Sequence, residues 1–501
     1  MQQRKSGIIL SYLNLAISII IGLFYTPFLL RMLGSSEYGL YSLATALISY
    51  LSLLDLGFGN ALVRYNAKIR AEGEKDASLN GLFLIIYSCV AVICFIIGIF
   101  LCANISNFFN SSFTDEELYK ARIIFIILFA NVCISFPISV FTSLIKAYEK
   151  FTFSKIITIL NTVISKGVTV IILYSGFRTS IAVAAVTAAV SILLGLASVI
   201  YCFVNIHVEI SFKEMDKTLL KEITLYSFWI FINILVDQLY ASTDSVILAK
   251  VSGTAAVTVY TIGVTFNGYF TEMSTAISGV FLPHISQIIA SGKDMSLISE
   301  IFNRVSRLQY LFLSFTIFGF IIFGQEFIFL WAGPECYDSY YIALIIMIPA
   351  LIPLSQNLGI TVLQAMNRHK YRSIIYLFIA ILNVVLSIPL AIKYEGIGSA
   401  IGTAIANLIG QICVMNWYYS KKIGLDIPTY WKEISTITLK MLPLALPGVL
   451  MNYLWTNNTW IDLIIKIIIF SMIYIIYGWL IIFNDYEKGL IRNAKAKLIK
   501  R

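Results

Sequence analysis

Lys166 is the residue of this sequence whose surroundings most strongly suggest chemistry. It lies about midway along an apolar stretch, 153–174, with Ser165 and Thr169 nearby. If that stretch crosses a membrane, a charged side chain at its centre is costly and is usually retained for a function. The ammonium could attract an anion inside the protein, or it could form a structural ion pair with an acid such as Asp55. If the helix boundaries differ from those assumed, Lys166 does not lie at the centre of the span.

Arg31 and Arg64 lie at opposite ends of the first predicted helical hairpin. A guanidinium suits bidentate contact with phosphate better than an ammonium does, so Arg64 could bind an anionic headgroup at the inner membrane surface. Alternatively, Arg64 is an ordinary cationic anchor beside the membrane. Arg31 lies on the predicted outer side, where positive charge is disfavoured, and its alternative is an ion pair with Glu37.

Polar and acidic residues in the stretch 223–249 recur at spacings of four, three and four, which places them on one helix face. They are Asn233, Asp237, Tyr240 and Asp244. A carboxylate near mid-membrane, such as Asp237, could exchange a proton or bind Na⁺ with neighbouring oxygens. Glu272, in the stretch 256–283, is a second candidate for ion coupling. The alternative for Asp237 is an interhelical hydrogen bond or a salt bridge to Lys166.

The first apolar stretch, 8–31, has a polar stripe of its own. Its members are Ser11, Asn14, Ser18 and Tyr25. We expect this stripe to line an internal cavity, although small polar side chains also hold membrane helices together.

These residues must be positioned by membrane helices. The chain has 501 residues, of which 59% are hydrophobic and 13% charged, whereas a soluble protein carries about 25% charged residues. A helix needs roughly 20 apolar residues to cross the hydrocarbon, and barrel strands would alternate over about 10. We predict an all-α polytopic membrane protein with about fourteen spans, near 8–31, 39–62, 78–103, 120–145, 153–174, 180–205, 223–249, 256–283, 308–331, 341–365, 374–393, 397–419, 436–455 and 462–484.

Positive charge falls on alternate gaps between these spans. The N-terminus, the even-numbered gaps and the C-terminal tail hold 27 of the 36 lysines and arginines, and the odd gaps hold six. By the positive-inside rule both termini are cytoplasmic. The net charge of +9 therefore reflects topology, and we expect no nucleic-acid partner. Lys440 and Lys466 lie near span ends, so we expect their side chains to extend to the membrane surface.

Cysteine and histidine predict no metal site and no disulfide framework. Six of the seven cysteines are scattered through spans, and the three histidines are far apart in the sequence. We therefore expect no cofactor other than a coupling ion, Na⁺ or H⁺.

Two halves of the chain resemble each other. The segment that begins at Leu29 aligns with the one at Leu248 at a shift of 219 residues, so that Gly34 matches Gly253. The segment at Ser143 aligns with the one at Thr361 at a shift of 218. We predict an N-lobe of six spans over 1–206, a C-lobe of six over 207–420, and two further spans with a basic cytoplasmic tail over 421–501. Transporters with such repeats bind their ligand between them and alternate its access.

The residues of the first hairpin resemble a known family, the bacterial oligosaccharide flippases of the Wzx type. The pattern has an Arg-x-Leu-Gly step, an acidic-x-Gly-x-Tyr turn, an Asp-x-Gly and a later arginine. Here these are Arg31, Leu33, Gly34, Glu37, Gly39, Tyr41, Asp55, Gly57 and Arg64. The segment from Leu363 to Ser373 is similar to the family's inner loop after the tenth helix, and Asp244 with Gly253 and Tyr260 also fits.

The resemblance implies two six-helix lobes in a V around a central cavity, as in multidrug exporters (MATE-like) and lipid II flippases, with two extra C-terminal helices. It also implies a substrate, undecaprenyl-pyrophosphate-linked oligosaccharide repeat units, moved from the inner to the outer leaflet for O-antigen, capsule or exopolysaccharide synthesis. Arg31, Arg64 and Lys166 would then bind the pyrophosphate, and the polar stripe would bind sugar hydroxyls weakly. Membrane lipids are expected partners, and polysaccharide polymerase machinery is a further candidate.

Two other functions remain open. A multidrug antiporter of the same fold would need an acidic and aromatic cavity for organic cations, which Lys166 argues against. A membrane polymerase or ligase would need a catalytic cluster on a large outer loop, and the outer gaps are short. The sequence identifies neither the sugar nor the coupling ion, and it leaves the oligomeric state open.

Overall fold

The structure, a computed structural model, describes residues 2–72, 76–109, 113–213, 217–278, 281, 285, 287–289, 295–366, 368–455, 459–489 and 492. Within these ranges the ordered elements are helices. Thirteen helical segments are long and apolar enough to cross a membrane, so the chain is a multi-pass membrane protein. Packing divides it into two compact units, 1–258 with 387–399 and 259–386 with 400–501. The predicted lobes, 1–206 and 207–420 with 421–501 appended, stay a prediction.

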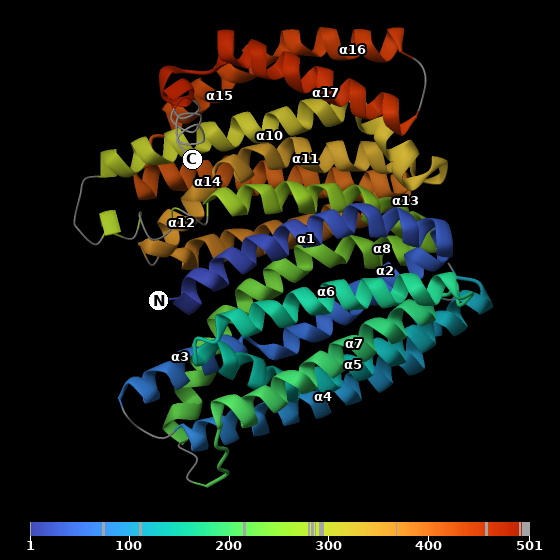
Figure 1. The fold of residues 1–501 in the computed structure, drawn as a ribbon, viewed down its shortest axis with the longest axis vertical. Helices are drawn as coiled ribbons and strands as arrows, with labels where there is room; N and C mark the ends of the chain where they lie inside the picture. The colour runs from blue at the N-terminus through green and yellow to red at the C-terminus, as the bar shows by residue number, and fades with distance from the viewer. Residues whose placement is uncertain are drawn as a thin grey trace. The chain divides into compact units, whose positions relative to one another are not determined.

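The first unit is built around one long central helix. Its elements are α1 (Gln2–Leu33), α2 (Ser35–Leu51), a 3₁₀ turn (Ser52–Asp55), α3 (Phe58–Ala71), α4 (Ala77–Phe109), α5 (Asp115–Ala147), α6 (Phe151–Tyr174), α7 (Ser180–Tyr201) and the first part of α8 (Lys217–Ser278). Helix α5 packs against α4, α7, α2 and α3, and Figure 1 shows α4, α5 and α7 side by side. Helix α1 packs against α6. The helices whose residues carry the predicted cations thus belong to one compact unit.

The second unit is organised around α10 (Met295–Ala332). The other elements are α11 (Ser339–Ser355), α12 (Asn357–Ala365), α13 (His369–Asn407, except residues 387–399, which belong to the first unit), α14 (Met415–Tyr418), α15 (Ile427–Met441), α16 (Ala445–Leu454) and α17 (Trp460–Tyr477), with π-helical turns at Leu408–Val414, Tyr419–Ile423 and Gly478–Ile482. Helix α10 packs against α11, α15, α16 and α17. The predicted extra helices at the C-terminus are therefore attached to this unit through α10.

The element α13 consists of two helices that fold back on each other and correspond to two of the predicted spans. The hydroxyl of Thr403 donates to Oδ1 of Asn383 at 3.0 Å, and the hydroxyl of Ser387 donates to the carbonyl oxygen of Ser399 at 3.4 Å. The backbone of α13 leaves helical geometry at Tyr394 and Glu395. This break falls between the predicted spans 374–393 and 397–419, so one continuous segment supplies two crossings.

Glycines of the first hairpin mark sharp changes of direction or close packing. Gly34 separates α1 from α2 with φ 82°, and Gly57 precedes α3 with φ 79°, a conformation that favours glycine. A Cβ atom on Gly57 would lie 2.7 Å from Ile230 on α8. A Cβ on Gly39 would lie 2.0 Å from the carbonyl oxygen of Thr254. The glycines of the family pattern therefore allow the backbone turns and the close helix packing of the first hairpin.

The backbone supports the predicted repeat. Gly253 breaks α8 with φ 82° and ψ −172°, close to the φ 82° and ψ 169° of Gly34, 219 residues earlier. Helices α5 and α12 end at Ala147 and Ala365, a shift of 218, and the next helices begin at Phe151 and His369, again a shift of 218.

The turns that follow α5 and α12 also have the same backbone hydrogen bond. The amide of Lys150 donates to the carbonyl oxygen of Ile145, and the amide of Arg368 donates to that of Leu363, both at 2.9 Å. Such agreement of backbone hydrogen bonds at one shift is not produced by apolar composition alone.

Candidate functional site

Lys166 on α6 lies against Tyr25 on α1. Its Nζ atom is 4.2 Å from the centre of the Tyr25 ring. A cation over an aromatic face is stabilised by about 0.5–2 kcal/mol, and this contact leaves the N–H groups of the ammonium able to donate to a ligand. The structure therefore joins two of the residues predicted separately, one from the cationic set and one from the polar stripe.

The alternative partner for Lys166, Asp55, is engaged elsewhere. The Oδ1 atom of Asp55 accepts a hydrogen bond of 2.5 Å from the hydroxyl of Tyr87, a buried residue of α4. Lys166 and Asp55 form no ion pair in the part of the chain that the structure describes. Lys166 thus contacts an aromatic ring rather than Asp55, while the alternative ion pair with Asp237 lies outside the described residues.

The polar stripe of α1 lies on the helix that packs against α6. Ser11, Asn14, Ser18 and Tyr25 are all half-buried. The Oδ1 atom of Asn14 is buried and accepts no hydrogen bond from the described residues. A buried acceptor without a donor is costly, so Asn14 is suited to accept a hydrogen bond from a hydroxyl that arrives with a ligand or from water.

The two arginines also belong to the first unit, Arg31 on α1 and Arg64 on α3. Arg31 is exposed in the last turn of α1. Arg64 is exposed on α3, and its guanidinium carbon lies 4.4 Å from the ring centre of Tyr226 and 5.9 Å from that of Tyr65. The two rings orient the guanidinium plane while its edge stays able to bind an anion.

Glu37 forms an ion pair that the sequence analysis did not identify. Its Oε1 atom lies 2.6 Å from Nζ of Lys120 on α5, and its Oε2 atom accepts hydrogen bonds from the amide and hydroxyl of Ser180 on α7. Lys120 is also 2.6 Å from Glu116. This network joins α2, α5 and α7 at one end of the unit, so Glu37 in the family pattern has a structural role. The signal available in the sequence was Lys120 itself, one of the few basic residues predicted outside.

The predicted coupling residues are only partly described. The side chains of Asn233 and Asp237 lie outside the described residues. Asp244 is buried, with 2% of its surface exposed, and belongs to the first unit. Glu272 is half-buried and belongs to the second unit. The structure therefore places Asp244 and Glu272 in different compact units.

Hydroxyl and amide groups are frequent near Asp244 in the sequence of α8. The hydroxyls of Tyr50 and Thr243 share a hydrogen bond of 2.5 Å, and Gln238 donates to Ser242 at 2.6 Å. The first bond connects α8 with α2 and the second lies within α8 itself, both on the N-terminal side of Asp244.

A second polar cluster joins α3, α4 and α5 at the end of the first unit that is predicted to be cytoplasmic. The hydroxyl of Tyr148 donates to Asp76 at 2.8 Å, and Asn66 donates to the same carboxylate at 2.8 Å. Burial and the Asp76 carboxylate raise the pKa of Tyr148 to about 12, so its phenol remains a donor at neutral pH. The guanidinium of Arg70 lies 3.6 Å from the Tyr148 ring centre. This cluster stabilises the loop between α5 and α6.

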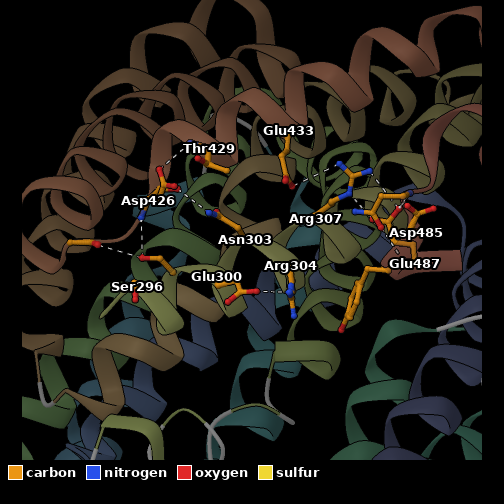
Figure 2. A pocket seen from close by; sticks show the side chains of 14 residues that line it. Ser296, Glu300, Asn303, Arg304, Arg307, Asp426, Thr429, Glu433, Asp485 and Glu487 are labelled. Atoms are coloured by element: carbon orange, nitrogen blue, oxygen red, sulfur yellow. Dashed lines mark hydrogen bonds and ion pairs between the residues drawn. The ribbon is translucent and has the colours of Figure 1, made fainter. Parts of the chain in front are cut away.

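The second unit contains a cavity of about 850 Å³ between α10, α15 and the start of the C-terminal segment. Figure 2 shows Arg307 directed at Glu487 and Glu433. Its Nε atom lies 2.6 Å from Oε1 of Glu487, and its Nη1 atom lies 3.8 Å from Oε2 of Glu433. Acids outnumber bases among its lining residues, which include Glu300, Asp426, Glu433, Asp485 and Glu487 against Arg304 and Arg307. Because acidic residues predominate in its lining, this cavity does not suit an anionic headgroup.

Lys466 corrects one expectation. We expected its side chain to extend to the membrane surface, but it is only 1% exposed and forms an ion pair of 2.9 Å with Glu326 on α10. The expectation was wrong because it considered one helix alone, whereas the partner lies 140 residues away in the sequence. Glu326 in an apolar span was the signal that could have indicated the pair.

Sequence comparison places this chain among proteins of sugar-polymer synthesis. A family model described as polysaccharide biosynthesis protein matches residues 4–289. A Shigella flexneri protein named as an O-antigen transporter is 22% identical over 402 residues, 79% of this chain and 92% of that protein. A Salmonella typhi protein of the same name is 29% identical over 90 residues, 18% of this chain and 21% of that protein.

Solved structures share the fold. The lipid II flippase MurJ in an inward closed conformation matches with a TM-score of 0.74 and 18% identity, covering 97% of this chain and 99% of that one. An inward-facing MATE family multidrug resistance transporter of the MOP superfamily matches with a TM-score of 0.56 and 17% identity, covering 81% and 96%. At these identities the likeness establishes the fold alone, and it agrees with the expectation of a MATE-like helical fold.

Proposed function

Because the chain belongs to the polysaccharide biosynthesis protein family, we propose that it is a flippase for lipid-linked sugar. Its substrates would be undecaprenyl-pyrophosphate-linked oligosaccharide repeat units, moved from the inner to the outer leaflet of a bacterial plasma membrane by alternating access. Both termini would be cytoplasmic, as the distribution of basic residues indicates. Relatives named as O-antigen transporters support this substrate class.

The observation that carries the proposal is the Lys166–Tyr25 contact within membrane-spanning helices. A pyrophosphate cannot cross hydrocarbon unless its charge is compensated. Among the described residues no carboxylate forms an ion pair with Lys166, so an ammonium held against an aromatic ring can offer such compensation. An organic cation would be repelled by the same group, which favours a flippase over a multidrug exporter.

The other residues would contact the substrate one after another as it crosses the membrane. Arg64 would meet the pyrophosphate first, at the cytoplasmic end, because its guanidinium is exposed and oriented by Tyr226. Lys166 and Arg31 would follow. The stripe of Ser11, Asn14 and Ser18 would contact sugar hydroxyls, and weak contacts suit a carrier because it must release what it binds.

Ion coupling would supply the direction of transport. In this proposal Asp237, with Asn233 and Asp244 on the same helix, binds Na⁺ or a proton, and Glu272 is the second candidate. An Asp237→Asn variant whose transport still collapsed when the ion gradient was removed would exclude Asp237 from this role.

Deletion of the gene tests the function. We expect lipid-linked repeat units to accumulate in the inner leaflet and surface polysaccharide to disappear, with both restored by the wild-type gene on a plasmid. Normal surface polysaccharide together with altered resistance to cationic drugs would contradict the flippase and favour the exporter.

A further inference from the structure

A cavity of about 380 Å³ lies where α10, α16 and α17 meet within the second unit. We call it the Lys466 pocket. Its polar lining residues are Gln325, Glu326, Asn452 and Lys466, and Tyr337 and Trp455 add aromatic rings with polar atoms. Its volume falls in the range of small-molecule sites. It is separate from the helices that carry Lys166 and the polar stripe.

The ion pair in this pocket leaves hydrogen-bonding groups unused. Lys466 is 1% exposed and contacts Glu326 through the Oε2 atom. An ammonium has three N–H donors, and this contact uses one of them. The Oε1 atom of Glu326 is buried and accepts no hydrogen bond from the described residues.

Asn452 also has a buried acceptor atom without a donor. Its Nδ2 atom donates to the carbonyl oxygen of Ile322 at 2.6 Å, whereas its Oδ1 atom is buried and accepts no hydrogen bond from the part of the chain described. Buried polar atoms in proteins are normally satisfied. The pocket therefore presents cationic donors and two free acceptors, one of them anionic, and fits a ligand with both an anionic and a donating cationic group.

The residues near the pocket are of the types found at a membrane surface. Trp455 lines it, and Trp460 begins α17 nearby in the sequence, as tryptophans do at the headgroup level. Next to them Tyr453, Leu454 and Ile461 are highly exposed, so acyl chains can cover them. A ligand that reaches the pocket from this side would be the headgroup of a lipid whose chains lie along α16 and α17.

We propose that the Lys466 pocket binds the headgroup of a phospholipid that carries a phosphate and a primary ammonium, as phosphatidylethanolamine does. The phosphate contacts the free N–H groups of Lys466. The ammonium donates to Oε1 of Glu326 and to Oδ1 of Asn452. A quaternary ammonium, as in phosphatidylcholine, has no N–H group and satisfies neither acceptor.

The test is lipid competition on the full-length protein. The protein is purified in detergent, mixed with equal amounts of phosphatidylethanolamine and phosphatidylcholine of identical acyl chains, and analysed by native mass spectrometry. We expect roughly tenfold more phosphatidylethanolamine to be retained, because loss of one charge-assisted hydrogen bond weakens binding by about that factor. Equal retention of the two lipids, as expected if the pocket holds only water, would overturn the proposal.

Substitutions in the pocket test whether it causes the preference for phosphatidylethanolamine over phosphatidylcholine. Glu326→Gln preserves shape and removes the anion, so the retention ratio should fall toward one. The Lys466→Met/Glu326→Gln double variant removes both charges, which keeps the test usable if Lys466→Met alone does not fold. Lys440→Met, which changes an exposed lysine of α15, is the matched control and should keep the wild-type ratio. An unchanged ratio in folded Glu326→Gln and in the folded double variant would also overturn the proposal.

Discussion

At the residue scale, two lysines in membrane helices have opposite environments. Lys466 is paired with Glu326 and nearly inaccessible, whereas Lys166 is half-buried and rests on the ring of Tyr25. A buried ion pair is satisfied within the protein apart from its spare donors and acceptors, while a cation on an aromatic ring retains its charge for a ligand. The two positions therefore predict different phenotypes for the same substitution.

Replacement of Lys166 by alanine should impair transport and leave folding intact. Removal of one charge-assisted contact to the pyrophosphate should slow transport roughly tenfold, measured as surface polysaccharide restored to a deletion strain. Lys166→Arg should retain part of the activity, since it keeps the charge. Lys155→Ala, at the beginning of the same helix, is the control. Full activity of Lys166→Ala at normal protein abundance would remove Lys166 from the site.

Replacement of Lys466 by alanine should instead destabilise the protein. Breaking a buried pair leaves an uncompensated charge and costs about 3–5 kcal/mol, so the thermal unfolding midpoint in detergent should fall. The Lys466→Met/Glu326→Leu variant removes both charges and should regain most of the loss. If the single and double variants unfolded at the same temperature, the pair would have no such role.

At the element scale, the spans could be predicted from hydropathy, but the breaks between them depend on particular residues. The left-handed conformations of Gly34 and Gly253 follow from glycine in a repeated pattern, and the break at Tyr394–Glu395 coincides with a gap in the apolar sequence. Lys120 and Glu326 stand out in the sequence as charges in unfavourable places, but their partners could not be assigned, because each of the Glu37–Lys120 and Glu326–Lys466 pairs joins helices far apart in the chain. Contacts of this kind depend on tertiary packing, which single-helix patterns do not contain.

The crossing of α2 and α8 depends on Gly39. A methyl group there would lie 2.0 Å from the carbonyl oxygen of Thr254 and 2.8 Å from its neighbour Thr258 Oγ1, so the helices would have to separate. We expect Gly39→Ala to destabilise the protein by about 1–3 kcal/mol. Gly319→Ala on α10, where a Cβ would meet nothing within 4 Å, should be neutral or stabilising by up to about 1 kcal/mol. Unfolding midpoints of the two variants compare them directly, and a stable Gly39→Ala would contradict the close crossing.

At the scale of the whole molecule, the backbone landmarks repeated at shifts of 218 and 219 residues are consistent with the predicted repeat of six spans, which stays a prediction. An even number of spans in each repeat keeps both copies in the same orientation in the membrane. The distribution of basic residues predicts one orientation for the whole chain, with both termini cytoplasmic, and in the proposed function the substrate enters from that side.

Reporter fusions check this orientation. A green fluorescent protein at the C-terminus should fluoresce, and an alkaline phosphatase there should be inactive, because both tails are predicted to be cytoplasmic. Alkaline phosphatase inserted in the gap near 104–119 should be active. The reverse pattern would invert the topology and, with it, the roles of Arg64 and Arg31.

The most direct measurement of the central claim is flipping by the purified protein in liposomes. Lipid vesicles containing the protein and a fluorescent undecaprenyl-pyrophosphate-linked oligosaccharide are treated with an impermeant reagent that modifies only the outer leaflet. The account predicts that the wild-type protein makes the inner-leaflet substrate accessible, and that Lys166→Ala does so roughly tenfold more slowly. Wild-type vesicles that expose no more substrate than empty ones, while taking up an organic cation, would contradict it.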